Sequence, residues 1–163
     1  MNPKDFLILL IVSFLWGGSF LFIRLLVLEG MEPLEIVSMR MLLASIFILP
    51  FLLNRSKKHS FKDHSLSFLL IGILNTALPF TLFAYASLQL GAGSLSVLQA
   101  TVPILTALIL FSLFKNEFSI SKLIGVLIGF VGLYVLVGPG SNFDLFSSIL
   151  CVVASLSLSL IHI

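Results

Sequence analysis

The longest stretch of this sequence without a charged side chain is a run of 50 residues from Ser65 to Phe114. A helix needs about 20 apolar residues to cross the roughly 30 Å hydrocarbon core of a bilayer. As one helix the run would be about 75 Å long at about 1.5 Å per residue, so it must fold back once. Glycine permits a tight reversal, and the Gly-Ala-Gly-Ser sequence at 91–94 is the predicted turn.

The composition places the whole chain in a membrane. Of its 163 residues 59% are hydrophobic and 10% are charged, whereas about 25% of a typical soluble domain is charged. This hydrophobicity excludes disorder, and Cys151, the single cysteine, excludes an internal disulfide framework. The net charge of +2 is too small to indicate a nucleic-acid partner, so nucleic acid is not an expected partner.

We therefore predict an all-α integral membrane protein, a five-helix transmembrane repeat followed by a partial sixth helix. Long apolar segments in lipid must be helical, because the bilayer core offers no hydrogen bonds to the backbone. A cleaved signal peptide is the less favoured interpretation of the first run, which is longer than the usual apolar region of about 7–15 residues. The predicted helices are Phe6–Leu28, Pro33–Leu53, Ser67–Leu90, Ser94–Phe114, Ser119–Val137 and a sixth from about Phe146 to the chain end.

The basic residues predict the orientation, because lysine and arginine in short loops stay in the cytoplasm. If the N-terminus is cytoplasmic, the connections on the opposite side carry only the acidic residues Glu29, Glu32 and Asp144. We expect a multi-pass protein of the cytoplasmic (inner) membrane. The basic residues on the cytoplasmic side are Lys4, Arg55, Lys57, Lys58, Lys62, Lys115 and Lys122.

The basic loop also contains His59, Asp63 and His64. A solvated loop that sets the topology is the favoured interpretation. A contact with lipid headgroups and a metal site are the alternatives, and the metal site is weak because the three residues lack helical spacing. No metal or cofactor is predicted.

Polar residues and prolines recur at helical spacing in three of the predicted helices. Packing between helices explains each residue alone, whereas prolines and polar side chains together in neighbouring helices indicate a polar cavity. The residues are Ser13, Trp16, Gly17 and Arg24 in the first helix, Gly72, Asn75, Thr76, Pro79 and Tyr85 in the third, and Ser96, Gln99, Pro103 and Thr106 in the fourth.

Two arginines lie within apolar stretches, where ionisable groups are costly and usually paired or functional. Arg24 is close enough to a helix end to reach the interface. Arg40 lies about 10 Å into the second helix at about 1.5 Å per residue. It could pair with Glu35 or attract an anionic group in a cavity, and the sequence leaves both open.

The fifth helix contains Gly125, Gly129 and Gly132, which share one face. Small residues let helices approach closely in lipid, so we predict helix packing at this face. The sequence lacks the common nucleophile, metalloprotease, phosphate-loop and redox motifs. Because no cluster of ionisable groups marks an active site, we do not expect an enzyme.

Several stretches resemble the EamA-type carriers of the drug/metabolite transporter superfamily. The run Val12–Phe20 resembles the first helix of that family, Arg40–Ala44 its second-helix arginine motif, and Val102–Leu108 its fourth helix. Glu117, with Lys122–Gly125 and Gly132, resembles the glutamate and glycine pattern between the fourth and fifth helices. The motifs keep their order and spacing over nearly the whole chain.

The resemblance implies export or exchange of small metabolites or drugs by alternating access. The usual family form has ten helices in two inverted five-helix repeats, as in other inverted-repeat carriers. Residues 1–138 would be one EamA-like repeat, and 139–163 a loop and the incomplete first helix of a second. The segment Leu150–Leu156 resembles the opening of that helix. We therefore expect a truncated carrier, whose second half would come from a homodimer or from a separate chain.

The leading hypothesis is a permease for small solutes, and the alternative is a non-transporting fragment of such a carrier. A small membrane enzyme using His59 and Asp63 is the least favoured possibility. Energy coupling is not predicted, because the first helix lacks the carboxylate that the related small multidrug resistance proteins use. The predicted substrate-binding residues are Trp16, Arg40, Asn75, Tyr85, Gln99 and Pro103.

Overall fold

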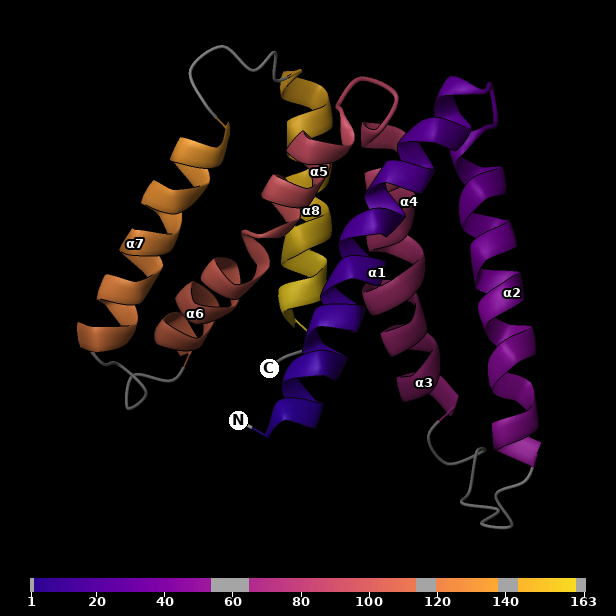
Figure 1. Ribbon diagram of the computed structural model, residues 1–163, viewed down its shortest axis with the longest axis horizontal. Helices are drawn as coiled ribbons and strands as arrows, with labels where there is room; N and C mark the ends of the chain where they lie inside the picture. Colours follow the sequence, from indigo (N-terminus) through magenta and orange to yellow (C-terminus); the bar gives the residue numbers. More distant parts are fainter. Residues whose placement is uncertain (1, 54–64, 114–119, 138–143, 161–163) are drawn as a thin grey trace.

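A computed structural model describes residues 2–53, 65–113, 120–137 and 144–160 of the chain, and these form helices without strands. The prediction of an all-α membrane protein is confirmed (Figure 1). The elements are α1 (Pro3–Leu28), α2 (Pro33–Leu53), α3 (Ser65–Gly72), the π-helical turn η1 (Ile73–Ala77), α4 (Leu78–Ala86), α5 (Ala92–Gln99), α6 (Val102–Leu113), α7 (Ile120–Val137) and α8 (Leu145–Leu160).

The helices occur where the sequence predicts them, with two breaks. The third predicted helix consists of α3, η1 and α4 and ends at Ala86, four residues before the predicted end. The fourth is divided into α5 and α6, because Ala100 and Thr101 leave the helical pattern. Within the described residues, four segments are long and apolar enough to span a membrane: Pro3–Leu28, Pro33–Leu52, Ser65–Ala86 and Ala92–Phe111.

Local interactions explain where α1 and α2 meet. Gly30 has a φ of 91°, a left-handed conformation that glycine adopts without steric cost. It closes the end of α1, and the backbone N–H of Met31 donates to the carbonyl of Leu26 at 3.1 Å. Glu35 in the first turn of α2 accepts a hydrogen bond from the backbone N–H of Glu32 at 3.2 Å. The connection between the two helices is therefore short and well defined.

The π turn in the third span leaves one carbonyl without a backbone donor. The N–H of Leu78 donates to the carbonyl of Ile73 instead of the carbonyl of Leu74. In a π pattern the Leu74 carbonyl would accept from the N–H of residue 79, but Pro79 has no N–H. The hydroxyl of Ser157 in α8 donates to the Leu74 carbonyl at 2.6 Å. Because an unsatisfied buried carbonyl is costly in lipid, α8 stabilises this turn.

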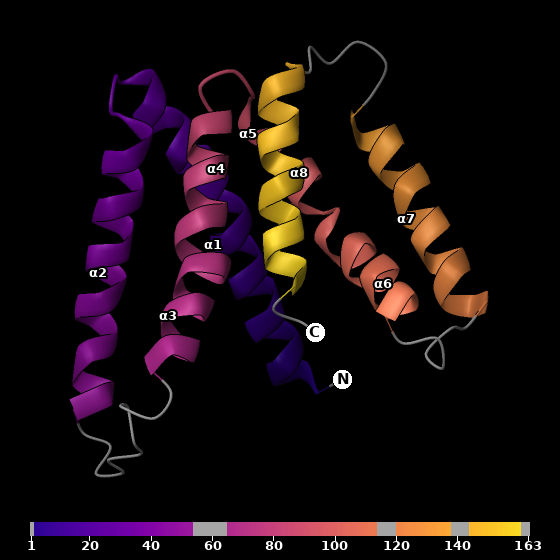
Figure 2. The ribbon, with the colours of Figure 1, turned by 180° about the vertical axis from the view of Figure 1, so that it is seen from behind.

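The same helix contacts the break in the fourth span. Ser155 Oγ donates to the carbonyl of Leu98 at 3.3 Å, and Ser159 Oγ donates to that of Val102 at 3.1 Å. These two carbonyls lie on either side of the break between α5 and α6. Figure 2 shows α8 between α4 and α6, where its serines reach both interrupted spans.

The core lies where α1, α4, α5 and α8 meet. α4 makes its most extensive contact with α8, and the rings of Phe20 and Phe83 meet edge to face at a centroid distance of 5.5 Å. Such aromatic pairs contribute about 0.5–1.5 kcal/mol beyond the burial of their area. The buried cluster consists of Phe20, Phe83, Ala86, Leu90, Leu95, Cys151, Ala154 and Leu158.

α7 lies at the periphery of the described structure (Figure 1). An added Cβ at Gly129 would meet Ile104 of α6 at 3.5 Å, whereas at Gly125 and Gly132 it would meet no heavy atom within 4 Å. Gly129 is thus the one of the three glycines that lies against another helix here. A shared packing face for all three stays a prediction.

Several sequence predictions fall outside the described residues. The basic loop with His59, Asp63 and His64, and the segment with Lys115 and Glu117, lie in the omitted ranges. Within the ranges that are described, no group of three histidine, cysteine or acidic residues could hold a metal ion.

Candidate functional site

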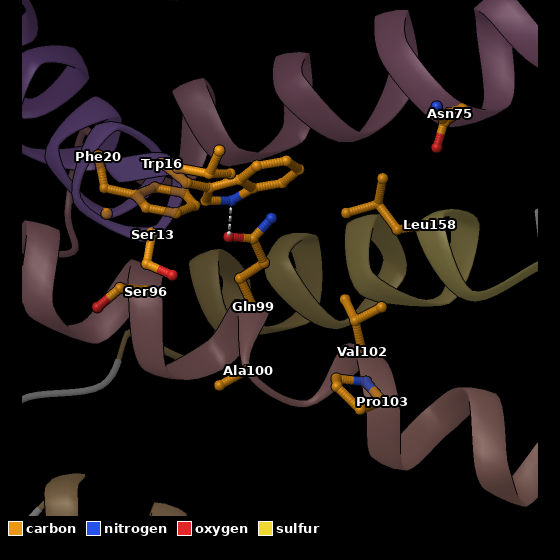
Figure 3. A pocket seen from close by; sticks show the side chains of 12 residues that line it. Ser13, Trp16, Phe20, Asn75, Ser96, Gln99, Ala100, Val102, Pro103 and Leu158 are labelled. Atoms are coloured by element: carbon orange, nitrogen blue, oxygen red, sulfur yellow. Dashed lines mark hydrogen bonds between the residues drawn. The ribbon is translucent and has the colours of Figure 1, made fainter. Parts of the chain in front are cut away.

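A cavity of about 720 Å³ lies between α1, the π turn, the α5–α6 break and α8. We call it the Trp16 cavity (Figure 3). It contains four of the six predicted substrate-binding residues, which come from three different membrane spans. Its lining residues are Val12, Ser13, Trp16, Gly17, Phe20, Asn75, Ser96, Gln99, Ala100, Val102, Pro103 and Leu158.

The spacing of residues in α1 explains which of its side chains face this cavity. Ser13, Trp16, Gly17 and Phe20 follow the i, i+3, i+4, i+7 pattern of one helical face. Gly17 leaves open space beside Trp16, because an added Cβ would meet no heavy atom within 4 Å. The first-helix motif therefore supplies one complete wall.

A hydrogen bond crosses the cavity from α1 to α5. The indole Nε1 of Trp16 donates to Oε1 of Gln99 at 2.9 Å (Figure 3). Because an indole N–H can only donate, this contact fixes the oxygen of the Gln99 amide toward Trp16. The amide nitrogen of Gln99 keeps two N–H donors for other partners.

The helix of the fourth span is broken next to Gln99, which lines the cavity. Gln99 is the last residue of α5, and Pro103 lacks the N–H that would bond to the Gln99 carbonyl in a continuous helix. Thr101 instead donates both its N–H, at 3.2 Å, and its hydroxyl, at 2.6 Å, to the carbonyl of Leu98. Irregular backbone at membrane depth is tolerated where it lines a cavity, as it does here.

The twelve lining residues include no ionisable side chain. The polar groups are the amides of Asn75 and Gln99 and the hydroxyls of Ser13 and Ser96, and the Ser96 hydroxyl already donates to the carbonyl of Gly93 at 2.8 Å. The remaining walls are aliphatic, aromatic or prolyl. The cavity therefore combines an apolar surface with a few hydrogen-bonding groups, as small-molecule sites commonly do.

Arg40 lies in a second cavity of about 550 Å³, between α1 and α2. We call it the Arg40 groove. Except for Ser19 and Arg40, its lining is apolar, and it shares no residue with the Trp16 cavity. Its lining residues are Leu15, Ser19, Phe22, Ile23, Leu26, Met31, Ile36, Met39, Arg40 and Leu43.

The charge of Arg40 is placed over an aromatic ring. Its guanidinium carbon lies 4.3 Å from the ring centroid of Phe80 in α4, a cation–π contact. Glu35 instead bonds to the backbone of Glu32, and no ion pair joins Glu35 to Arg40 in the described part of the chain. The sequence left two interpretations of Arg40 open. The described residues do not show the pairing with Glu35, and the attraction of an anionic group stays a prediction.

Tyr85, the sixth predicted residue, lines neither cavity. It belongs to α4, and its side chain is 44% exposed. A role for Tyr85 in binding solute stays a prediction.

Arg24 has a role that the sequence analysis missed. Its Nη1 donates to the carbonyl of Ser87 and, at 3.1 Å, to that of Leu88, just beyond the end of α4. These carbonyls lie where a helix runs out of its own donors. Phe20 and Leu158 also line the Trp16 cavity without having been predicted, because apolar residues give no signal that separates a cavity wall from a core.

Comparison with known proteins identifies relatives over most of the chain. The sequence profile of the EamA-like transporter family matches residues 4–138, which confirms the resemblance seen in the motifs. No solved structure gives a significant match.

Three curated relatives illustrate the similarity. The chain is 30% identical over 151 residues to an uncharacterized transporter of Archaeoglobus fulgidus, covering 91% of this chain and 50% of that protein. It is 32% identical over 146 residues to the uncharacterized inner membrane transporter YedA of Escherichia coli K12, covering 88% and 47%. It is 31% identical over 121 residues to an uncharacterized transporter in the trpA 3′ region of Buchnera aphidicola, covering 74% and 40%. The chain spans half the length or less of these relatives.

Proposed function

Because the chain belongs to the EamA-like transporter family, we propose that it forms one wall of a permease of the drug/metabolite type. The permease moves small metabolites or drugs across the cytoplasmic membrane by alternating access. The family and the names of the relatives indicate a transporter rather than an enzyme. Residues 1–138 constitute the first repeat and residues 139–163 begin the second.

The Trp16 cavity is the observation that supports this proposal best. Trp16, Asn75, Gln99 and Pro103 converge there from three spans, and both broken spans, α3–α4 and α5–α6, contribute to its lining. Broken helices at the bilayer midplane are a common way for carriers to expose backbone groups to a solute. These four residues are the proposed contacts for solute.

The proposed orientation has the N-terminus in the cytoplasm, where lysine and arginine are retained. The start of α1, the end of α2, the end of α6 and the start of α7 lie at the same end of the molecule (Figures 1 and 2). This common end supports the sequence-based topology. A reporter fused after Asn54 should be active only in the cytoplasm, and activity outside the cell would contradict this topology.

Uptake into proteoliposomes tests the proposed activity. The purified chain is reconstituted alone and together with a separately expressed five-helix second half from a longer relative. Radiolabelled metabolites and drugs are then screened for uptake. In parallel, the emission of Trp16, the single tryptophan, reports binding in the cavity.

The two readouts separate the proposal from its alternative. Uptake that saturates with solute concentration supports a permease. Binding at Trp16 without uptake in either preparation would identify the alternative, a non-transporting fragment of such a carrier. Neither binding nor uptake for any solute would contradict both.

A further inference from the structure

We infer that the Trp16 cavity selects uncharged solutes that have an apolar or aromatic body and a hydrogen-bond acceptor. This inference rests on the proposed function of the cavity and names the class of its substrate. It depends on three features: the absence of a counter-charge, the position of the two intramembrane arginines, and the free donors of Gln99.

The first feature is the lining itself. None of its twelve residues can ionise, and a charge that leaves water without a partner costs far more free energy than a hydrogen-bonded polar group does. An ion in the cavity would face amides, hydroxyls and apolar walls only. The described residues therefore disfavour anions and cations alike.

The second feature is that both candidate cations are engaged elsewhere. Arg24 donates to the Ser87 and Leu88 carbonyls at the end of α4. Arg40 lies over Phe80 and lines the separate Arg40 groove. Neither arginine lines the Trp16 cavity, so an anionic group of a solute gains no salt bridge from either of them.

The third feature gives the cavity its polarity. Trp16 occupies the carbonyl oxygen of the Gln99 side chain at 2.9 Å, which leaves the amide nitrogen as a donor. A bound solute satisfies this donor best with a carbonyl, ether or hydroxyl oxygen, because a buried donor without a partner is costly. The indole ring of Trp16 and the side chains of Phe20 and Val102 offer the surface for an apolar body.

Three probes of similar size test the inference: benzamide is neutral, benzoate is an anion and benzylammonium is a cation. Each is titrated against the full chain in lipid nanodiscs while the emission of Trp16 is recorded, with empty nanodiscs as the blank. Benzamide should bind at least about tenfold more tightly than either ion, since the ions enter without a counter-charge.

A single substitution should reverse this selectivity. In Gln99→Glu the carboxylate still accepts from Trp16, but it replaces the free N–H donors with a negative charge. At about pH 8, well above the ordinary glutamate pKa of about 4.3, the variant should prefer benzylammonium to benzamide. Gln89→Glu is the matched control, because Gln89 is an exposed residue that does not line the cavity, and it should keep the preference for benzamide.

The outcomes separate this inference from the function on which it rests. Equal binding of the three probes, or tighter binding of an ion to the unsubstituted chain, would overturn the selectivity while leaving the cavity as a binding site. Absence of a Trp16 response to all three probes would contradict the site as well. If Gln99→Glu does not fold, the comparison of the three probes on the unsubstituted chain still decides the matter.

Discussion

The Trp16 cavity and the Arg40 groove lie on two faces of the same helix, but they satisfy their polar groups differently. In the cavity, polar side chains of separate spans bond to one another, as Trp16 does to Gln99. In the groove, a single full charge is held against the ring of Phe80. The two sites are similar in size, so volume does not distinguish them.

An intramembrane charge and a cavity built by several spans are therefore two different indicators of a binding site. Arg40 is the most unusual residue of its span, yet the groove around it is otherwise almost entirely apolar. The uncharged cavity instead collects residues from α1, the third span, the fourth span and α8. In a membrane, a cavity built by several spans is the stronger indicator of a solute path.

The largest effect should come from filling the cavity. Gly17→Phe places a ring in the open space beside Trp16, so benzamide affinity should fall by more than about tenfold, a change of about 1.4 kcal/mol. The measurement is the Trp16 titration in nanodiscs. Gly18→Phe makes the same change of residue type where the neighbourhood is also open but outside both cavities, and it should bind normally. Unchanged benzamide affinity in Gly17→Phe would show that benzamide does not bind in the Trp16 cavity.

Gln99→Leu should have the next largest effect. Leucine has no N–H to donate to the carbonyl of benzamide, and a hydrogen bond of this kind contributes about 0.5–1.5 kcal/mol. Benzamide affinity should therefore fall by about fivefold or more, as measured by the same titration. Gln89→Leu is the control in an exposed turn. If Gln99→Leu binds benzamide as well as the unsubstituted chain, the free amide donors of Gln99 do not contact solute.

Ser157→Ala should affect stability more than binding. The Leu74 carbonyl would lose its only described partner from another helix, at a cost of about 1 kcal/mol. The variant should unfold at a lower temperature, and Ser157→Thr should restore most of the loss. Ser148→Ala removes a hydroxyl that donates locally, to the carbonyl of Asp144 just before α8, at 2.8 Å, and it should have less effect. Equal losses for Ser148→Ala and Ser157→Ala would show that the bond to Leu74 is unimportant.

Arg40→Gln should have the smallest effect on the cavity. The groove shares no lining residue with the cavity, and sites without shared partners are usually independent within about 0.3–0.5 kcal/mol. Benzamide affinity should change by less than about twofold. A larger change in the Trp16 titration, with the variant still folded, would mean that the two faces of α1 are coupled.

Much of the helical architecture could be predicted from apolar runs and charge placement, because lipid permits few alternatives to helices. The positions of Trp16, Asn75, Gln99 and Pro103 along their spans indicated a shared polar cavity, and the structure brings these four together. The exact form of the two helix breaks was harder to predict. Pro79 and Pro103 signalled interruptions, but a π turn depends on a partner such as Ser157, which lies 83 residues from Leu74 in the chain.

Arg40 and Tyr85 show that helical spacing does not predict which neighbouring helix a residue faces. Spacing tells which residues share a face, but the neighbour of that face depends on how helices cross. Arg40 faces α1 and Phe80 of α4 rather than the broken fourth span. For Tyr85, the π turn inserts about one residue, or roughly 100° of rotation, between it and Asn75. A face drawn for a regular helix is therefore misaligned beyond the turn.

The contact of Arg24 with the end of α4 has a consequence for motion. It joins α1 and α4 at one end of the molecule through the Ser87 and Leu88 carbonyls, whereas the other ends of these two spans lie apart (Figure 1). The rings of Phe20 and Phe83 hold the same two spans together one helical turn further along. A displacement of α1 against the third span would therefore be smallest near these two contacts and largest toward Pro3 and Ser65.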